Sequence, residues 1–371
     1  MYLKSLSLQN FRNYEKSEFN FSKDTTFIVG PNTAGKTNII EAIYLLSNGK
    51  SFRGEKDAQM VRFGEELGRI KANLGNLPAG PLRRIEASRQ ETMEVVLTTG
   101  EVGSKKTPFK KFLINGVSKR RLDFVGNFYT VLFSPLDLEI IIGSPSLRRN
   151  LMDTVLEQAD LDYRIAISEY EKGLRQRNSL LDLTRKTGER DLKQFDYWDN
   201  VLIKNGQVIT AKREAFIAFV NSERKEIFDF AVVYDRSTIS YERLLQYQQE
   251  ELYAGVTLVG PHRDDINFQM YDNERQTTHN IKLFGSRGQQ RLTILQLKLL
   301  ELSFVEKGKK ERPTLLLDDI FSELDESHIK HVIDMVSKQQ TIITTTHKEF
   351  IPSKIIKEAE VIDLPRRQGG T

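Results

Sequence analysis

The chain lacks cysteine, long apolar runs and a marked excess of either charge, and each absence excludes a class of protein or site. Without cysteine among its 371 residues, it can form neither disulfide bonds nor thiolate metal sites. No apolar run approaches the ~20 residues that a membrane helix needs. Residues 1–8 alternate like a strand and lack the apolar core of a signal peptide. We therefore expect a cytoplasmic protein that does not enter a membrane.

Charge and length set the general class of molecule. The chain has 55 lysines and arginines against 51 acidic residues, so its net charge of +4 permits an acidic partner without requiring one. With 39% hydrophobic and 29% charged residues, the composition is typical of a globular protein. The length is sufficient for a large core and for two or three subdomains.

The strongest motif is a phosphate-binding loop near the N-terminus. Residues 30–38 match the pattern G-x-x-x-x-G-K-[ST], between a short apolar strand and a helix with apolar residues at helical spacing. In that context backbone N–H groups and the positive helix end face an anion, Lys36 can reach the β and γ phosphates, and the Thr37 hydroxyl can bind Mg²⁺. A glycine-rich turn is the simpler alternative, but the flanking strand and helix favour a nucleotide site. Its predicted residues are Gly30, Pro31, Asn32, Thr33, Ala34, Gly35, Lys36, Thr37 and Asn38.

A second motif ends an apolar strand in two carboxylates. Residues 314–319 read Thr-Leu-Leu-Leu-Asp-Asp. A nucleotide site needs one acidic residue for Mg²⁺ and one for the attacking water, which are the roles predicted for Asp318 and Asp319. A strand that runs into a turn aspartate is common, so this motif is weak by itself.

The middle of the chain changes character twice. Short strands separated by turns extend from about residue 70 to 129, and helical periodicity follows over 147–228, with a break near Gly188. We predict a helical hairpin there, too short for a coiled-coil arm. The predicted parts are therefore 1–146, an inserted helical subdomain at 147–228, and 229–371.

Basic residues in these segments indicate a possible nucleic-acid surface. Lysines that alternate with phenylalanines can follow a phosphate backbone. A solvated strand edge protected by lysines is an equally good interpretation. The candidate DNA contacts are Lys105, Lys106, Lys110, Lys111, Arg148 and Arg149.

Several later segments carry weak signals. Ser286, Gly288 and Gln289 precede a helix and can present N–H donors to an anion. Asp325 lies at the start of a later helix. His347 ends another apolar strand, where α/β proteins collect ligands, although an ordinary core or surface histidine is the simpler alternative. The charged turn at 260–265 has no chemistry that its sequence alone can assign.

The order of these motifs resembles that of ATP-binding-cassette ATPases. The long separation of the phosphate loop from the serine segment, with helices between, resembles the heads of SMC-type chromosome proteins. Within that group the chain resembles the RecF family of bacterial recombination and repair proteins. The segments that carry this resemblance are 6–14, 50–53, 133–138, 143–149, 170–181, 260–265 and 288–291.

The resemblance implies a fold and a mode of action. The fold is an α/β, two-lobed P-loop ATPase head with a short helical insertion. ATP and Mg²⁺ lie between two protomers: one supplies the phosphate loop, Asp318 and Asp319, and the other supplies the signature residues Ser286, Gly288 and Gln289, with Asp325. Lys36, Asp319 and His347 are the implied catalytic residues, and Thr37 and Asp318 the implied Mg²⁺ ligands.

The resemblance also implies partners. ATP-dependent dimers bind gapped or junction DNA near the nucleoid, slow DNA-stimulated hydrolysis releases them, and RecR and RecO cooperate in loading recombinase.

Two departures from the family pattern affect the site. Relatives usually carry glycine where this chain has Thr33. If that backbone position needs a positive φ, a β-branched residue there would cost roughly 1–2 kcal/mol, which bears on the affinity for nucleotide and not on whether nucleotide binds. No glutamine lies between residues 127 and 150, so no residue is assigned to the metal-contacting glutamine of cassette ATPases.

Two other functions share part of the motif set. The ATPase subunit of a transporter, or another SMC-like ATPase, would use the same loop. Stimulation of the ATPase by DNA, compared with stimulation by membrane vesicles, separates the repair protein from the transporter subunit. A metabolic P-loop kinase would leave residues 286–290 unexplained and would transfer phosphate to a small molecule.

Overall fold

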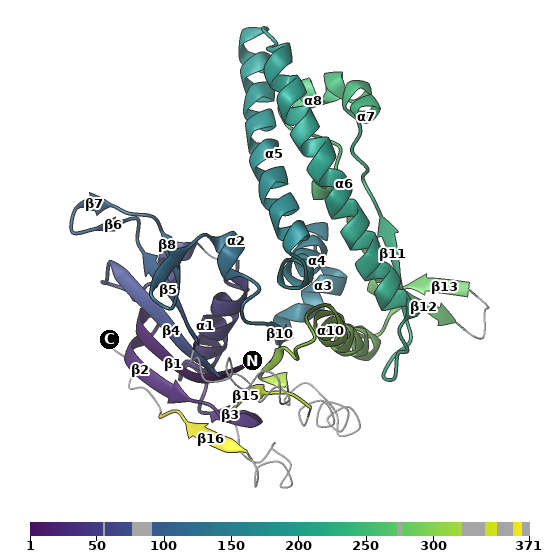
Figure 1. Ribbon diagram of the computed structural model, residues 1–371. Helices are drawn as coiled ribbons and strands as arrows, with labels where there is room; N and C mark the ends of the chain where they lie inside the picture. Colours follow the sequence, from purple (N-terminus) through teal and green to yellow (C-terminus); the bar gives the residue numbers. More distant parts are fainter. Residues whose placement is uncertain (55, 76–90, 273–276, 321–337, 347–358, 366–371) are drawn as a thin grey trace, which may run out of the picture. The chain divides into compact units, whose positions relative to one another are not determined.

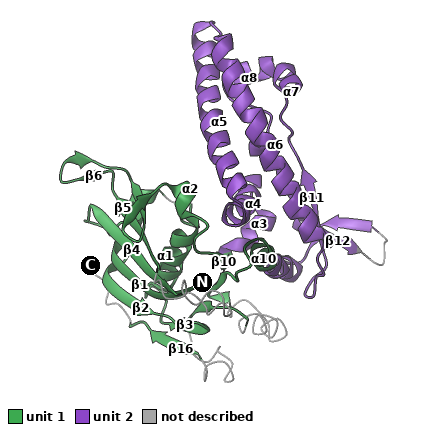
Figure 2. Ribbon diagram, viewed as in Figure 1, with its two compact units in different colours: residues 1–135, 301–371 green, residues 136–300 purple. Residues whose placement is uncertain are grey.

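The computed structural model describes residues 1–371 except 55, 76–90, 273–276, 321–337, 347–358 and 366–371 (Figure 1). These residues form two compact units, one made of 1–135 and 301–371 and the other of 136–300 (Figure 2). The second unit starts before and ends after the helical subdomain predicted at 147–228, and the strands at 231–235 and 265–272 pack against helices of that subdomain. None of the described helices combines the length and apolar character that crossing a membrane requires.

A parallel sheet forms the centre of the first unit. Its strand order is β10-β14-β15-β3-β16, and all neighbouring strands are parallel. Every residue of β3, β14 and β15 is buried, which explains their almost continuous apolar or threonine runs. The strands are β3 (Thr25–Val29), β10 (Thr130–Phe133), β14 (Thr314–Asp318), β15 (Thr341–Thr345) and β16 (Glu360–Asp363).

An antiparallel sheet covers the other side of helix α1 (Lys36–Asn48). Its strand order is β2-β1-β4-β5-β8-β9. The helix contacts strands of both sheets and is buried almost all round, so it forms the centre of the apolar core. These strands are β1 (Tyr2–Phe11), β2 (Tyr14–Asn20), β4 (Leu67–Gly75), β5 (Glu91–Thr98), β8 (Lys110–Ile114) and β9 (Val117–Lys119).

Smaller elements complete this unit. A separate hairpin pairs β6 with β7, and its two strands carry only surface residues or partly exposed ones. The smaller elements are β6 (Glu101–Val102), β7 (Lys105–Lys106), η1 (Asp57–Met60) and α2 (Arg121–Phe124). Helix α1 ends at a turn that contains Gly49.

The second unit contains the predicted helical hairpin. Its arms are α5 (Leu161–Thr187) and α6 (Leu192–Ser222), which pack along each other. Gly188 ends α5 with a left-handed φ of 75°, and the side chains of Asp160 and Asp191 accept hydrogen bonds from the first turns of α5 and α6. The hairpin is thus confirmed, with its break at the predicted residue.

The remaining elements of this unit pack around the hairpin. They comprise short helices and the antiparallel sheet β11-β12-β13. Helix α10 starts in the second unit and ends in the first. The bounds are η2 (Pro135–Leu138), α3 (Glu139–Ile142), α4 (Pro145–Ala159), β11 (Ala231–Asp235), α7 (Tyr241–Gln246), α8 (Gln248–Ala254), η3 (Pro261–Arg263), β12 (Asp265–Asp272), β13 (Thr277–Asn280), α9 (Ile281–Phe284) and α10 (Arg287–Lys309).

The charged turn at 260–265 is a buried anchor between these elements. The carboxylate of Asp264 is fully buried and accepts a hydrogen bond from Arg213 of α6 at 2.8 Å, and Arg213 also pairs with Asp153 of α4 at 2.7 Å. Tyr234 of β11 donates to the same Asp264 carboxylate. Removing one partner of a buried ion pair costs about 3–5 kcal/mol, so this turn serves the fold of the unit.

His262 lies in the same turn as a neutral imidazole. Its Nε2 contacts the Thr257 carbonyl at 3.0 Å and must carry the proton, so Nδ1 accepts from the Tyr170 hydroxyl at 2.8 Å. Burial, together with nearby arginines, lowers the pKa of His262 from its usual 6.5 to about 4.

We expect this histidine to make the protein less stable in acid. A folded-state pKa below the unfolded value contributes stability that is complete above pH 6.5 and is lost as the pH falls towards 4. Denaturant unfolding at pH 7 and pH 5 measures the loss. The His262→Gln variant should lose less stability over this interval, and an unchanged pH dependence in that variant would contradict the assignment.

Candidate nucleotide-binding site

The phosphate loop joins β3 to α1 at the carboxyl edge of the parallel sheet. Gly35 precedes the helix with a left-handed φ of 103°, and an added Cβ would lie 2.8 Å from the side chains of Asn13 and Tyr14. Only glycine fits this position. The first turn of α1 contains no acidic residue, so its positive end is left for an anion.

Lys36 places a buried ammonium group within the loop. Its Nζ donates to the carbonyl oxygens of Gly30 at 2.7 Å and Pro31 at 3.1 Å. Burial lowers the pKa of Lys36, and the carboxylates of Asp319 and Asp318 oppose that shift. The loop therefore surrounds a cation, which suits the phosphates of a nucleotide.

Asp318 lies at the end of β14, opposite the start of α1. The Thr37 hydroxyl donates to Asp318 Oδ1 at 3.1 Å, and the Thr344 hydroxyl donates to the same oxygen at 2.7 Å. Burial raises the pKa of Asp318, while these two hydrogen bonds lower it. A hydroxyl beside a carboxylate next to a phosphate loop is a donor set that fits Mg²⁺.

Asp319 and Thr344 complete this edge of the sheet. Asp319 has a left-handed φ of 50°, and its backbone N–H donates to Thr344 Oγ1 at 3.0 Å. Sequence reasoning missed Thr344, because it forms part of an apolar strand and of no nucleotide motif. Only the strand register, which pairs Asp318 with Thr344, brings them together.

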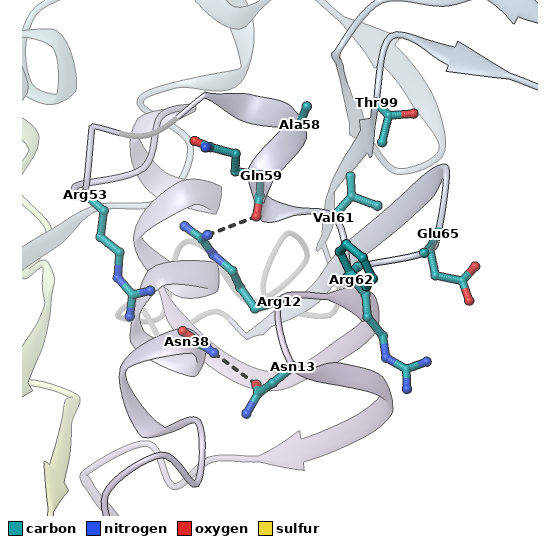
Figure 3. Close-up of a pocket in the computed structure, with 12 residues that line it drawn as sticks. Arg12, Asn13, Asn38, Arg53, Ala58, Gln59, Val61, Arg62, Glu65 and Thr99 are labelled. Carbon is teal, nitrogen blue, oxygen red and sulfur yellow. Dashed lines mark hydrogen bonds between the residues drawn. The ribbon is translucent and has the colours of Figure 1, made fainter. Parts of the chain in front are cut away.

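A cavity of about 590 Å³ lies beside the phosphate loop within the first unit (Figure 3). Asn38 of α1 lines it, and its amide donates to Asn13 Oδ1 at 2.9 Å. Arg12 and Arg53 line it as well, and Phe63 is fully exposed at 102% of its reference area. The cavity thus offers amide, guanidinium and aromatic groups next to the loop.

A buried carboxylate holds the two arginines in place. Glu41 of α1 is fully buried and accepts hydrogen bonds from Arg12 Nε at 2.9 Å and from Ser51 Oγ at 2.5 Å, while Arg53 lies 3.6 Å away. One carboxylate therefore faces two guanidinium groups, which leaves this wall of the cavity with an excess of positive charge. No local sequence pattern indicates that the basic turn at 50–54 lies near Arg12. Both contact Glu41, and that shared contact forms only in the folded chain.

The predicted signature residues cap α10 in the second unit. Gln289 N donates to Ser286 Oγ at 3.2 Å, and Ser286 N donates to Gln289 Oε1 at 2.8 Å, which is a capping box. Ser286 and Gly288 are exposed. An added Cβ at Gly288 would have only Ser286 Oγ within 4 Å, at 3.8 Å, so packing within the described chain does not demand glycine there.

Other predicted residues have different outcomes. Asp325 and His347 lie outside the described residues. The guanidinium of Arg148, one of the predicted DNA contacts, is buried and pairs with Asp265 at 2.6 Å. Arg149 is half-buried and donates to the Asp264 carbonyl at 2.7 Å.

The predicted lysines divide into two kinds. Lys110 is held by Asp57 at 2.9 Å and by the Gly49 carbonyl at 3.0 Å. Lys105, Lys106 and Lys111 are exposed and remain candidates for a phosphate backbone.

Comparisons with known proteins identify similar chains over almost the whole length. A family model described as the RecF/RecN/SMC N terminal domain matches residues 2–363. The DNA replication and repair protein RecF of Bacillus thuringiensis (strain Al Hakam) is 33% identical over 387 residues, which cover 98% of this chain and 97% of that relative.

Solved structures are similar over the same length. The recombination mediator protein RecF of the RecFOR pathway has been solved as RecF-ATP and as RecF-ATPrS, each 29% identical to this chain, with TM-scores of 0.82 and 0.81. Each match covers 95% of this chain and respectively 93% and 94% of the solved chain. These similarities confirm the expected α/β head with a helical insertion.

Thr33 has a positive φ of 73°, a backbone conformation that favours glycine, and its side chain is exposed. Thr33→Asn should raise the free energy of unfolding by about 1 kcal/mol, because asparagine adopts left-handed backbone at lower cost than a β-branched residue. Chemical denaturation measures this change. Thr33→Val keeps the branch and is the control. A Thr33→Asn variant no more stable than Thr33→Val would contradict the strain.

Proposed function

This chain belongs to the RecF family of DNA replication and repair proteins, and on that basis we propose that it is an ATPase whose ATP-bound dimer holds DNA during recombinational repair and replication-fork maintenance. The observation that carries the proposal is the hydrogen bond between Thr37 and Asp318 beside a loop that holds Lys36. This hydrogen bond supports the proposal because it brings the two expected Mg²⁺ ligands together next to the loop that is expected to bind the phosphates.

The loop and its neighbours have separate roles in binding ATP. Backbone N–H groups of residues 30–38 and Lys36 hold the β and γ phosphates. Thr37 and Asp318 would hold Mg²⁺, which supplies charge neutralisation at the phosphates when bound. The cavity beside Asn38, which Arg12 and Arg53 also line, receives the nucleoside end.

Hydrolysis requires a positioned water molecule. Asp319 follows Asp318, the proposed metal ligand, and the carboxylate of Asp319 orients or deprotonates that water. His347 is proposed as a second catalytic group from its place after β15.

A second copy of the chain completes the site. Ser286, Gly288 and Gln289 are proposed to contact the γ-phosphate bound by the partner, and Asp325 is proposed to contribute to the same site. Two observations support this: Ser286 and Gly288 face solvent, and Gly288 has open space around it that its own chain does not explain. ATP then stabilises the dimer by mass action, and removal of the γ-phosphate by hydrolysis releases it.

DNA binding is proposed for the exposed lysines of the first unit. Lys105 and Lys106 lie on the β6–β7 hairpin, and Lys111 lies on β8, close to the edge strand β9. Their ammonium groups suit the phosphates of gapped or junction DNA, at which the protein would act with RecR and RecO in loading recombinase.

Sedimentation velocity with and without ATP and Mg²⁺ tests the dimer. The purified protein should sediment as a dimer only with ATP, and an unchanged monomer at saturating ATP would contradict the model.

Lys36→Met should lose nucleotide binding, since the ammonium group of Lys36 lies at the centre of the loop. Asp319→Asn should bind ATP and dimerise but hydrolyse it far more slowly, and normal turnover there would remove Asp319 from catalysis.

Salt-dependent binding to gapped, duplex and single-stranded DNA tests the surface. Replacing Lys105, Lys106 and Lys111 together by Gln should weaken binding and make the dependence of log K on log salt shallower, by about 0.9 for each duplex phosphate that is no longer neutralised. The matched control replaces three exposed lysines of α5 and α6 by Gln: Lys172, Lys193 and Lys204. Equal weakening in both triple variants would show that general charge, and not this surface, binds DNA.

A further inference from the structure

Thr344 occupies a position defined by strand pairing. It lies in β15, and the parallel register with β14 places it beside Asp318. Neighbours in register on paired strands point to the same face of the sheet. The side chain is fully buried, so its hydroxyl needs partners within the protein.

The one hydroxyl group of Thr344 bonds to two consecutive residues. Its oxygen accepts from Asp319 N at 3.0 Å, and its proton goes to Asp318 Oδ1 at 2.7 Å. These roles are not interchangeable, because a backbone N–H can only donate and an ionised carboxylate can only accept. Thr344 therefore connects the predicted metal ligand to the predicted water-positioning residue through a single atom.

Each hydrogen bond fixes a different part of the site. Asp319 has a φ of 50°, which is uncommon for a residue other than glycine, and the hydrogen bond from its N–H helps to hold that turn. At Asp318, the hydroxyls of Thr344 and Thr37 both donate to Oδ1. Two donors on the same oxygen fix the plane of the carboxylate and leave Oδ2 as the oxygen that can turn to a cation.

We propose that Thr344 is a positioning residue for ATP hydrolysis, which sets the orientation of Asp318 and Asp319 through its hydroxyl group. The inference rests on the proposed ATPase function. Both hydrogen bonds of this hydroxyl go to the two aspartates and neither goes to the phosphate loop, so removing it should impair hydrolysis and Mg²⁺ use more than ATP binding.

Two substitutions separate the hydroxyl from the shape of the side chain. Thr344→Val keeps the volume and the branch but removes both hydrogen bonds, whereas Thr344→Ser keeps the hydroxyl. In the full-length protein, Thr344→Val should lower kcat by about 10- to 100-fold, as is usual when a group that orients a metal ligand is removed. It should also raise the Mg²⁺ concentration for half-maximal activity, with little change in the KM for ATP. Thr344→Ser should restore most of both.

A third variant controls for the removal of any buried hydroxyl from this sheet. Thr26 of β3 is fully buried, and its Oγ1 accepts from Ser22 N at 3.0 Å, away from the carboxylates. Thr26→Val should keep kcat and the Mg²⁺ dependence of the parent. Equal effects in Thr26→Val and Thr344→Val, or a Thr344→Ser variant as slow as Thr344→Val, would overturn the proposal.

Hydrogen exchange of the Asp319 amide gives a readout that does not need hydrolysis. The amide should exchange faster in Thr344→Val than in the parent and in Thr26→Val, because its acceptor is gone. A parent protein that fails to hydrolyse ATP would refute the proposed function. Unchanged exchange in Thr344→Val would instead refute the role of Thr344.

Discussion

The parallel pairing of β14, β15 and β3 is the constraint on which the candidate site depends. These strands are buried throughout, so a register slip would expose apolar residues or bury unpaired backbone. Their carboxyl ends consequently meet at one edge of the sheet, where the phosphate loop, Asp318 and Thr344 come together. Residues more than 280 positions apart, such as Thr37 and Asp318, thereby come within hydrogen-bond distance.

Buried charge is organised in a similar way in both units. In the first unit, Glu41 holds Arg12 and lies near Arg53 at the cavity beside the loop. In the second unit, Asp264 and Arg213 tie a turn to the helices around it. Because a buried charge is tolerated only with partners, each cluster fixes the relative positions of the elements that supply it. The first cluster shapes a candidate binding site, and the second stabilises a fold.

Features that depend on neighbouring residues could be predicted from the sequence, whereas features that depend on distant partners could not. The helical hairpin could be predicted with its break at Gly188, since local periodicity and a left-handed glycine mark it directly. Arg148 and Lys105 could not be told apart in the same way. Both are basic residues near polar turns, but Arg148 meets Asp265, more than 110 positions later, and is buried, whereas Lys105 stays exposed. Burial depends on distant partners, and a single basic residue carries no signal about them.

The sequence by itself determined the phosphate loop, the pair Asp318–Asp319 and the hairpin, because each is a local pattern whose backbone conformation follows from neighbouring residues. It also indicated that Thr33 would strain the loop, and its φ of 73° agrees. Tertiary structure alone decided that Thr344 joins both aspartates and that Glu41 gathers two arginines. Such interactions arise from strand register and helix packing across long separations, so no short run of residues can specify them.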